Sequence, residues 1–356
     1  MASVEKFRGK VFNQNVFEKY LRTLPSTKKN TLIKDALFTV VNKYKSKMSE
    51  QAGGYFVTEP IKGRLGGTPV NYDGNTDIPD GVERDTFFQT KICFGRAMSW
   101  GEYDFTSEIT GENFMAEAGE VKEYWEDREQ EIVLSILKGI FAMTGGANAR
   151  FVVKHTYDIT GEENPLLGAD SLNKASQKAL GDMKQDLRVM YAHSAVSTNL
   201  EGLNLINFLK YTDSNGIERD LTIGTYNGKL VIVDDDMPAE EVTEGSGDNA
   251  TTYTKYTSYL FKEGFFEYED LGVLVPSEVA RNAKVKGGKN ELISRIRKMI
   301  VPTLISYKTT NKISPENTDF ENGANWELVN NGETSAANKV YVDDKLIPVV
   351  RIISRG

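Results

Sequence analysis

One run of consecutive carboxylates in this chain has the side chains that a metal site requires. Asp234, Asp235 and Asp236 are consecutive carboxylates, and hard cations such as Ca²⁺ prefer carboxylate oxygens. They follow the apolar run Lys229–Val233, which predicts a strand. Neighbouring side chains of a strand point to opposite faces, so three consecutive carboxylates do not converge on one ion. The pattern therefore favours a strand end or turn before Pro238 over a metal site.

Candidate nucleophiles and bases are equally isolated in the sequence. The two histidines, His155 and His193, lie on separate predicted elements, and neither has a serine-elbow or thiol partner. The one cysteine, Cys93, lies between apolar residues, as expected of a small buried hydrophobe, and excludes an intrachain disulfide. Thr144-Gly145-Gly146 follows a predicted helix, whereas a phosphate-binding glycine loop precedes one. We therefore expect no enzyme activity, no metal and no cofactor.

The longest periodic segment of the chain runs from Glu112 to Met143. Its apolar residues recur every three or four positions, so a helix would present them as one broad stripe. Seven carboxylates between Glu117 and Glu131 fill the remaining positions, and Gly145-Gly146 is expected to end the helix. At about 1.5 Å per residue, such a helix would be roughly 45 Å long. This predicted spine helix is longer than a small domain and requires an extended partner surface.

Charge is distributed unevenly along the 356 residues. The first 48 residues carry eleven Lys and Arg against three acidic residues, a net charge of +8, so the remainder carries −16 of the total of −8. Such a basic arm can contact nucleic acid or an acidic neighbouring subunit, and the acidic spine favours the neighbour. The sequence has no recognisable signal peptide and no apolar run long enough to span a membrane. We expect a protein that is made in the cytosol.

Two segments of different composition precede the spine. Residues 1–50 combine a polar lead with short helical patterns, the second of them over Leu32–Val41. From 53 to 111, frequent Gly and Pro separate short β-like runs at Tyr55–Thr58 and Phe87–Trp100, which predicts a long two-stranded excursion. A two-stranded ribbon is marginally stable alone. It therefore needs cover from the body of its own subunit or from another subunit.

Beyond the spine, short strands and helices are mixed, as in an α+β protein. A strand is predicted over Phe151–Tyr157, and helices over Asp170–Leu209 with a break at Gly202. A hairpin around Asn227-Gly228 and a flexible loop at Glu240–Thr252 follow. The remaining predictions are a strand pair over Tyr253–Tyr268 that turns near Gly264, and strands at Thr303–Tyr307 and Ile347–Ile353.

The run Val231-Ile232-Val233-Asp234-Asp235-Asp236-Met237-Pro238, preceded by the Asn-Gly turn, resembles a strand of the major capsid proteins of tailed phages of Gram-positive bacteria. Other segments match that family in the same order: Asp170 with Ala192–Ser194, Tyr256–Phe261 with Gly264, Gly287-Gly288 with Leu292 and Arg295, Ser314–Asn317, Asn325–Glu327, and Arg355-Gly356. Motifs thus cover residues 170–356, while residues 1–157 agree in architecture only.

The resemblance implies an α+β fold of the Hong Kong 97 type. Residues 1–50 would form an N-terminal arm, 53–111 the extended loop, 112–165 the peripheral domain with the spine helix, 166–285 the axial domain, and 286–356 the return to both sheets. It also implies a structural shell protein that assembles into hexamers and pentamers around packaged double-stranded DNA, without sequence-specific binding. The protein would be assembled in the host cytoplasm and found in the virion.

The resemblance also gives expected assembly contacts. Lys62 and Arg64 of the extended loop, with the basic arm, would lie over Glu120, Glu123 and Asp127 on the spine of an adjacent subunit. A covalent link from Lys62 to an asparagine would need a Lys, an Asn and a buried Glu from different subunits, and we do not expect one.

Two departures from the family and two alternatives remain. Val301-Pro302 replaces the family's His-Pro, so no histidine role is carried over. No coiled coil of about a hundred residues precedes the arm, so a scaffolding protein would be a separate chain or absent, and a portal would be a separate chain. A bacterial nanocompartment shell has the same fold and would enclose an enzyme. A carbohydrate-binding β-rich module is suggested by the aromatic residues of Tyr253–Tyr268.

Overall fold

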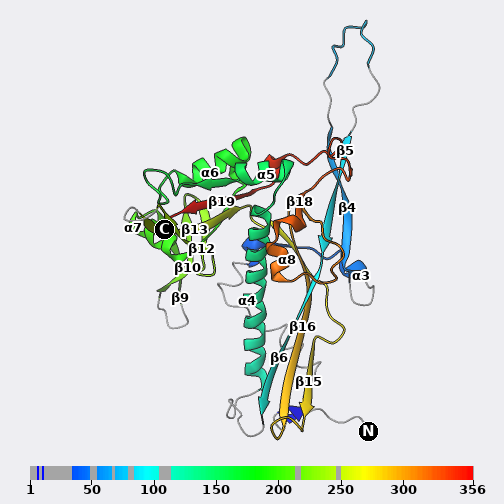
Figure 1. The fold of residues 1–356 in the computed structure, drawn as a ribbon, viewed down its shortest axis with the longest axis vertical. Coiled ribbons are helices and arrows are strands. Elements are labelled where there is room, and N and C mark those ends of the chain that lie inside the picture. The colour runs from blue at the N-terminus through cyan, green and yellow to red at the C-terminus, as the bar shows by residue number, and fades with distance from the viewer. Residues whose placement is uncertain are drawn as a thin grey trace.

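Two β-sheets lie on either side of one long helix, and a two-stranded ribbon projects at one end of the molecule (Figure 1). The computed structural model describes residues 6–7, 10–11, 34–48, 54–65, 69–78, 84–103, 114–212, 218–245 and 250–355. Most of the predicted N-terminal arm lies outside these residues. The described part of the arm holds the short strands β1 (Lys6–Phe7) and β2 (Lys10–Val11), which pair with each other.

The spine helix is confirmed as α4 (Phe114–Phe141). The expected start at Glu112 lies outside the described residues. The buried stripe of the helix is formed by Val121, Trp125, Ile132, Val133, Ile136, Leu137 and Ile140. Trp125 Nε1 donates a hydrogen bond of 3.0 Å to Ser294 Oγ, so the helix packs directly on one of the sheets.

The larger sheet has eight strands and its own apolar core. In spatial order the strands are β7 (Thr156–Asp158), β19 (Val349–Ser354), β13 (Thr251–Phe261), β8 (Val189–Ala192), β11 (Lys229–Val233), β10 (Glu218–Tyr226) and β9 (Ile206–Thr212), with β12 (Ala239–Glu244) paired to β13. Helices α6 (Ser171–Leu180) and α7 (Ser194–Gly202) contribute to this core. The predicted hairpin turn is confirmed, because Asn227 and Gly228 join β10 to β11 with φ of 50° and 72°.

The smaller sheet has five strands and carries the spine. It consists of β15 (Ser277–Asn282), β16 (Lys289–Pro302), β14 (Phe266–Asp270), β3 (Phe38–Val40) and β6 (Phe94–Tyr103), the last paired to β16. Near it lie α3 (Lys45–Met48), the pair β17 (Ile305–Tyr307) and β18 (Trp326–Leu328), α8 (Asn317–Glu321) and a 3₁₀ turn at Gly323–Asn325. Two other 3₁₀ turns, at Gly181–Asp186 and Asp344–Leu346, lie beside α6.

The predicted ribbon is confirmed as the antiparallel pair β4 (Phe56–Leu65) and β5 (Arg84–Ile92). The single run expected over Phe87–Trp100 is wrong, however, because the chain changes sheet at Cys93. The N–H of Cys93 donates to Tyr55 O, at the base of the ribbon, while β6 begins at the next residue and pairs with β16. The ribbon is therefore attached directly to the smaller sheet.

The strand predicted over Phe151–Tyr157 is mostly a helix, α5 (Gly146–Lys154), and only Thr156–Asp158 is extended. Val152 and Val153 suggested a strand, but Val153 is exposed, whereas Phe151 packs on Phe141. One buried face per helical turn thus outweighs β propensity. The expectation that Thr144-Gly145-Gly146 follows a helix without preceding another is also wrong, because α5 begins at Gly146.

The helical segment predicted over Asp170–Leu209 is interrupted by a strand. The residues of β8 are all buried, with no alternation, so their pattern could not be distinguished from helical spacing. Leu203–Leu209 is not a helix either, because β9 begins at Ile206. Likewise, the helix predicted over Leu32–Val41 ends before β3, which pairs with β14.

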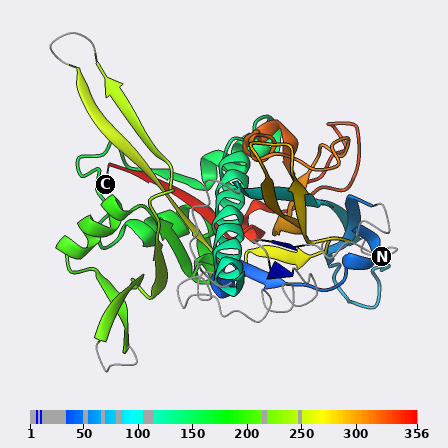
Figure 2. The same cartoon turned by 90° about the horizontal axis from the view of Figure 1, so that it is seen from below.

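Two further predictions in the C-terminal half are wrong. The strands of Tyr253–Tyr268 do not pair with each other: β13 belongs to the larger sheet and β14 to the smaller. Gly264, with φ of 66°, lies where the chain crosses between them. The loop at Glu240–Thr252 is a β-hairpin of β12 and β13, which projects far from the body (Figure 2).

Candidate assembly surfaces

The outer face of α4 carries the three predicted contact carboxylates. Glu120, Glu123 and Asp127 are exposed and lie three and four residues apart, which places them on one side of the helix. We call these three residues the acidic ridge. A row of negative charge on a straight helix is a suitable surface for a basic segment of another chain.

The inner face of α4 also carries carboxylates, although the sequence pattern predicts that all seven lie outside the apolar stripe. Glu126 is 5% and Glu129 2% exposed. Lys34 Nζ lies 3.0 Å from Glu126 Oε1 and 3.8 Å from Glu129 Oε2, and Lys298 forms an ion pair with Glu129. Burial lowers the pKa of Lys298, but the charge of Glu129 outweighs it and holds that pKa above its usual range. Lys34, a residue of the basic arm, thus pairs with the spine of its own subunit.

The position of Glu129 contained a signal for its burial. It lies four residues after Trp125 and three before Ile132, both of which are buried. Residues at this spacing share one face of a helix. Glu129 therefore belongs to the apolar stripe, and such a position requires a cation.

Lys62 and Arg64 are exposed on β4. Neither has an ion pair within the described part of the chain. The ribbon runs beside the body and past its end, at a distance from α4 (Figure 1). One subunit therefore does not bring these two cations to its own acidic ridge.

A buried charge network fixes the base of the ribbon. Lys91 Nζ lies 2.7 Å from Tyr44 Oη, 3.2 Å from Glu59 Oε2 and 2.5 Å from Glu267 Oε2. Lys91 is only 2% exposed. Burial raises the pKa of Glu59, but hydrogen bonds from Tyr44 and Lys91 outweigh it, so that pKa lies below its usual value. Because the network joins β4 and β5 to β14, it holds the ribbon at a set angle to the smaller sheet.

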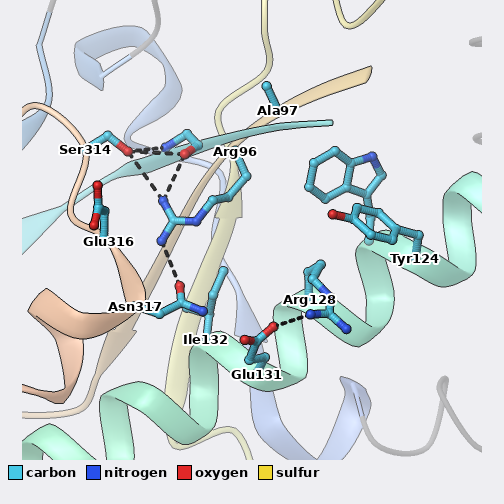
Figure 3. Close-up of a pocket in the computed structure, with 11 residues that line it drawn as sticks. Arg96, Ala97, Tyr124, Arg128, Glu131, Ile132, Ser314, Glu316 and Asn317 are labelled. Atoms are coloured by element: carbon cyan, nitrogen blue, oxygen red, sulfur yellow. Dashed lines mark hydrogen bonds and ion pairs between the residues drawn. The ribbon is translucent and has the colours of Figure 1, made fainter. Parts of the chain in front are cut away.

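An open pocket of about 480 Å³ lies between α4, β6 and the segment before α8 (Figure 3). Arg96 Nη2 donates to Asn317 Oδ1 at 2.9 Å, and Arg128 Nη1 donates to Glu131 Oε2 at 2.6 Å. Tyr124, 40% exposed, lies on its rim. Arg128 and Glu131 pair with each other, whereas Arg96 bonds to the neutral side chain of Asn317, so the pocket offers a polar recess for a neighbouring side chain.

Asp234 and Asp235 accept hydrogen bonds from separate partners, as the strand-end interpretation predicts. Tyr191 Oη donates to Asp234 at 2.9 Å, the N–H of Ser194 donates to Asp235 at 3.3 Å, and Asp236 contributes its own N–H to Asp234 at 2.9 Å. Among the described residues, no group of three or more His, Cys, Asp or Glu is placed to hold a metal ion.

The histidines and the cysteine have structural surroundings. His155 is buried, its Nδ1 lies 2.6 Å from Val349 O, and burial lowers its pKa to about 4. His193 Nδ1 accepts from the N–H of Ala195 and caps α7. Burial raises the pKa of the Cys93 thiol, which opposes formation of the reactive thiolate.

Most aromatic residues of the segment that suggested sugar binding are in the core, although Tyr253 and Tyr256 are partly exposed. Tyr259, Phe261, Phe265 and Phe266 are buried in the apolar core between the sheets. Within the described ranges, no single helix is long and apolar enough to cross a membrane; α4 and α5 pass such a test only together, across a bend of 112°.

Comparison with known proteins gives one relative over most of the chain. No family model matches. The major capsid protein of Bacillus phage SPP1 is 31% identical over 238 residues, which are 66% of this chain and 67% of that protein. Among solved structures, the capsid asymmetric unit of cyanophage Pam1 aligns over the full length of both chains with a TM-score of 0.54 at 10% identity. The fold is therefore of the Hong Kong 97 type, and the chain belongs to the family of phage major capsid proteins.

Proposed function

We propose that many copies of this chain, as hexamers and pentamers, close into the icosahedral head shell of a tailed phage. The observation that carries this proposal is the relationship to a major capsid protein over two thirds of both chains. The geometry supports it, because the ribbon projects from the body with Lys62 and Arg64 unpaired in the described part of the chain. The role is structural, and the protein is a component of the virion.

The arm and the extended loop keep their predicted bounds in this proposal, while the axial and peripheral domains follow the two sheets, so β7 is axial and β14 and β15 are peripheral. The larger sheet is the axial domain, and the smaller sheet with α4 is the peripheral domain, so the chain crosses between them near Gly264. The enclosed double-stranded DNA is held without sequence-specific contacts. A separate scaffolding protein and a portal complete the head, which is assembled in the host cytoplasm.

The contact that we propose between subunits joins the ribbon to the acidic ridge. Lys62 and Arg64 of one copy lie over Glu120, Glu123 and Asp127 of the next. Each exposed pair contributes only about 0–1 kcal/mol, but a shell repeats the contact many times.

Sedimentation and negative-stain microscopy of the purified chain test the assembly itself. We expect rings of five and six or closed shells at micromolar concentration, because obligate interfaces usually bury more than about 2,000 Å². A stable monomer of 39.7 kDa would contradict the proposal.

Deletion of Ile61–Asp80, closed by a short Gly-Ser link, tests the ribbon. The subunit should stay folded, since the buried residues of the three apolar clusters lie outside the deleted segment and only the partly buried Ile61 packs against one of them, yet closed shells should be absent. Circular dichroism reports folding and microscopy reports assembly. Normal shells from the deletion variant would show that the ribbon is a surface hairpin that is not needed for contact between subunits.

A further inference from the structure

Three cations line up across neighbouring strands at one end of the larger sheet. Val189 is opposite Leu230 on β11 and opposite Phe261 on β13. One residue further out, the same register aligns Arg188, Lys229 and Lys262. Residues aligned across adjacent strands project from the same face. We call these three residues the basic row.

The basic row lacks carboxylate partners in the described part of the chain. Lys229 Nζ donates to the neutral Leu187 O at 2.5 Å. Its pKa is lowered by burial and then by the charges of Arg188 and Lys184. Lys184 in turn donates to Asn173 Oδ1 at 2.9 Å, another neutral oxygen. Arg188 and Lys262 are exposed. Like charges are thus held close together, which is unfavourable until an anionic partner arrives.

Acidic residues lie at the other end of the same sheet. Glu240 and Glu241 of β12 are exposed, and neither has an ion pair among the described residues. Lys255 pairs in register with Glu240 and lies 5.8 Å from the Tyr253 ring centroid, and Arg355 lies over the same ring at 3.6 Å. The hairpin that carries them, here called the acidic hairpin (Ala239–Tyr256), projects beyond the rest of the subunit (Figure 2).

The two charged surfaces cannot meet within one subunit. Glu240 is opposite Lys255, seven residues before Lys262 along the extended chain, which is a separation of roughly 23 Å at about 3.3 Å per residue. Two different, complementary surfaces on one chain form a heterologous contact, which generates a ring when the rotation between copies closes.

We propose that the acidic hairpin of one copy contacts the basic row of the next copy around a capsomer. This contact rests on the proposed function, because it needs copies arranged in rings. Glu240 and Glu241 point to opposite faces of β12, which is an edge strand. The hairpin therefore meets the basic row with its edge, with one carboxylate towards Arg188 and the other towards Lys262, and Lys229 adds its charge from beside Arg188. The contact differs from that between ribbon and acidic ridge, because it lies entirely within the larger sheets of neighbouring copies.

Charge reversal with rescue tests the pairing. One variant carries Arg188→Glu and Lys262→Glu, a second carries Glu240→Lys and Glu241→Lys, and a third carries all four changes. We expect the assembled fraction of the first two to fall roughly tenfold at low salt, because like charges across an interface are strongly unfavourable. The third restores the pairing in every copy and should assemble. The loss should shrink at about 1 M salt, where the Debye length is about 3 Å.

A matched control carries Lys284→Glu and Lys308→Glu, which change the net charge as much as Arg188→Glu with Lys262→Glu does, at exposed sites outside the larger sheet. This control should assemble normally. If the wild type and the control also fail to form rings, the proposed function fails instead of the contact. Normal assembly of either reversed variant, or no rescue in the third, would overturn the contact. Normal shells with reduced DNA content would show that the basic row binds phosphates instead.

Disulfide trapping gives a second measurement that does not depend on charge. Cys93 is buried, so a chain with Glu241→Cys and Lys262→Cys has two accessible thiols. Under mild oxidation we expect a ladder of covalent oligomers from this variant and monomers from each single variant. Monomers from the double variant, or dimers alone from a single variant, would contradict a heterologous contact.

Discussion

The two faces of α4 place the same residue type in opposite environments. Glu126 and Glu129 are buried and paired with Lys34 and Lys298, whereas the acidic ridge on the other face is exposed. Burying a carboxylate costs several kcal/mol unless a cation and hydrogen bonds compensate. The inner face therefore decides whether the subunit folds, while the outer face is free to serve assembly.

The same contrast appears in the ribbon. At its base, Lys91 is buried among Glu59, Glu267 and Tyr44, and further along β4, Lys62 and Arg64 are exposed. The subunit satisfies the charges that it buries and leaves others at the surface. Substitutions on the two kinds of site should consequently have separable effects on unfolding and on assembly.

The largest effect on stability is expected from Lys298→Met. This change leaves the buried Glu129 with only Lys34, whose Nζ is 3.8 Å away. Removing one partner of a buried pair typically costs about 3–5 kcal/mol, so the free energy of unfolding should fall by that amount. Urea denaturation of dissociated subunits, followed by circular dichroism, measures it.

Two matched variants sharpen the result. Glu129→Leu combined with Lys298→Met should recover most of the loss, because no charge then remains unpaired. Glu123→Ala on the outer face should change the free energy of unfolding by no more than about 0.5 kcal/mol. A cost below about 1 kcal/mol for Lys298→Met would mean that the inner pair does not govern stability.

Local periodicity predicted α4, the ribbon and the Asn227-Gly228 turn, because each depends on residues close together in the sequence. The pairing of the inner carboxylates could not be predicted in this way. Lys34 and Glu126 are 92 residues apart, and Lys298 and Glu129 are 169 apart, so only the folded chain brings them together. The crossing at Gly264 was missed for a related reason, because sheet membership depends on strands far along the chain.

Polar hairpins were the second source of error. Val242 and Thr243 are opposite Tyr253 and Thr252, and the two threonine hydroxyls are 2.9 Å apart. No strand of this hairpin has a continuous apolar face, so the alternation that normally predicts a strand is absent. The acidic ridge was placed correctly in solvent by its spacing, although its role as a contact stays a prediction.

A smaller effect on stability is expected from pH, through a group that is buried without charge. Burial lowers the pKa of His155 to about 4, below the value of about 6.5 in an unfolded chain. The unfolded state therefore binds more protons between these values. The stabilisation is complete above pH 6.5 and is lost as pH falls towards 4, by about 2 kcal/mol between pH 7 and 4.5.

His155→Gln isolates this contribution, because glutamine can still donate to Val349 O but does not titrate in this range. Its free energy of unfolding should fall less between pH 7 and 4.5 than that of the wild type, by about 2 kcal/mol. Equal pH dependence of the two proteins would show that His155 is protonated in the folded state.

The smallest effect on unfolding, and the clearest on assembly, is expected from reversing the acidic ridge. With Glu120→Lys, Glu123→Lys and Asp127→Lys, each exposed change should alter the free energy of unfolding by no more than about 0.5 kcal/mol. The same changes replace attraction to Lys62 and Arg64 of the next copy by repulsion, so shells should form poorly. Because the charges are exposed, assembly of the wild type should weaken with salt, while the variant should lose part of its defect. Light scattering measured at several salt concentrations compares assembly of the wild type with that of the reversed variant. A Lys138→Glu variant, at the far end of α4, is the control. Shells that form equally well from the reversed variant would leave the outer face without a role in assembly.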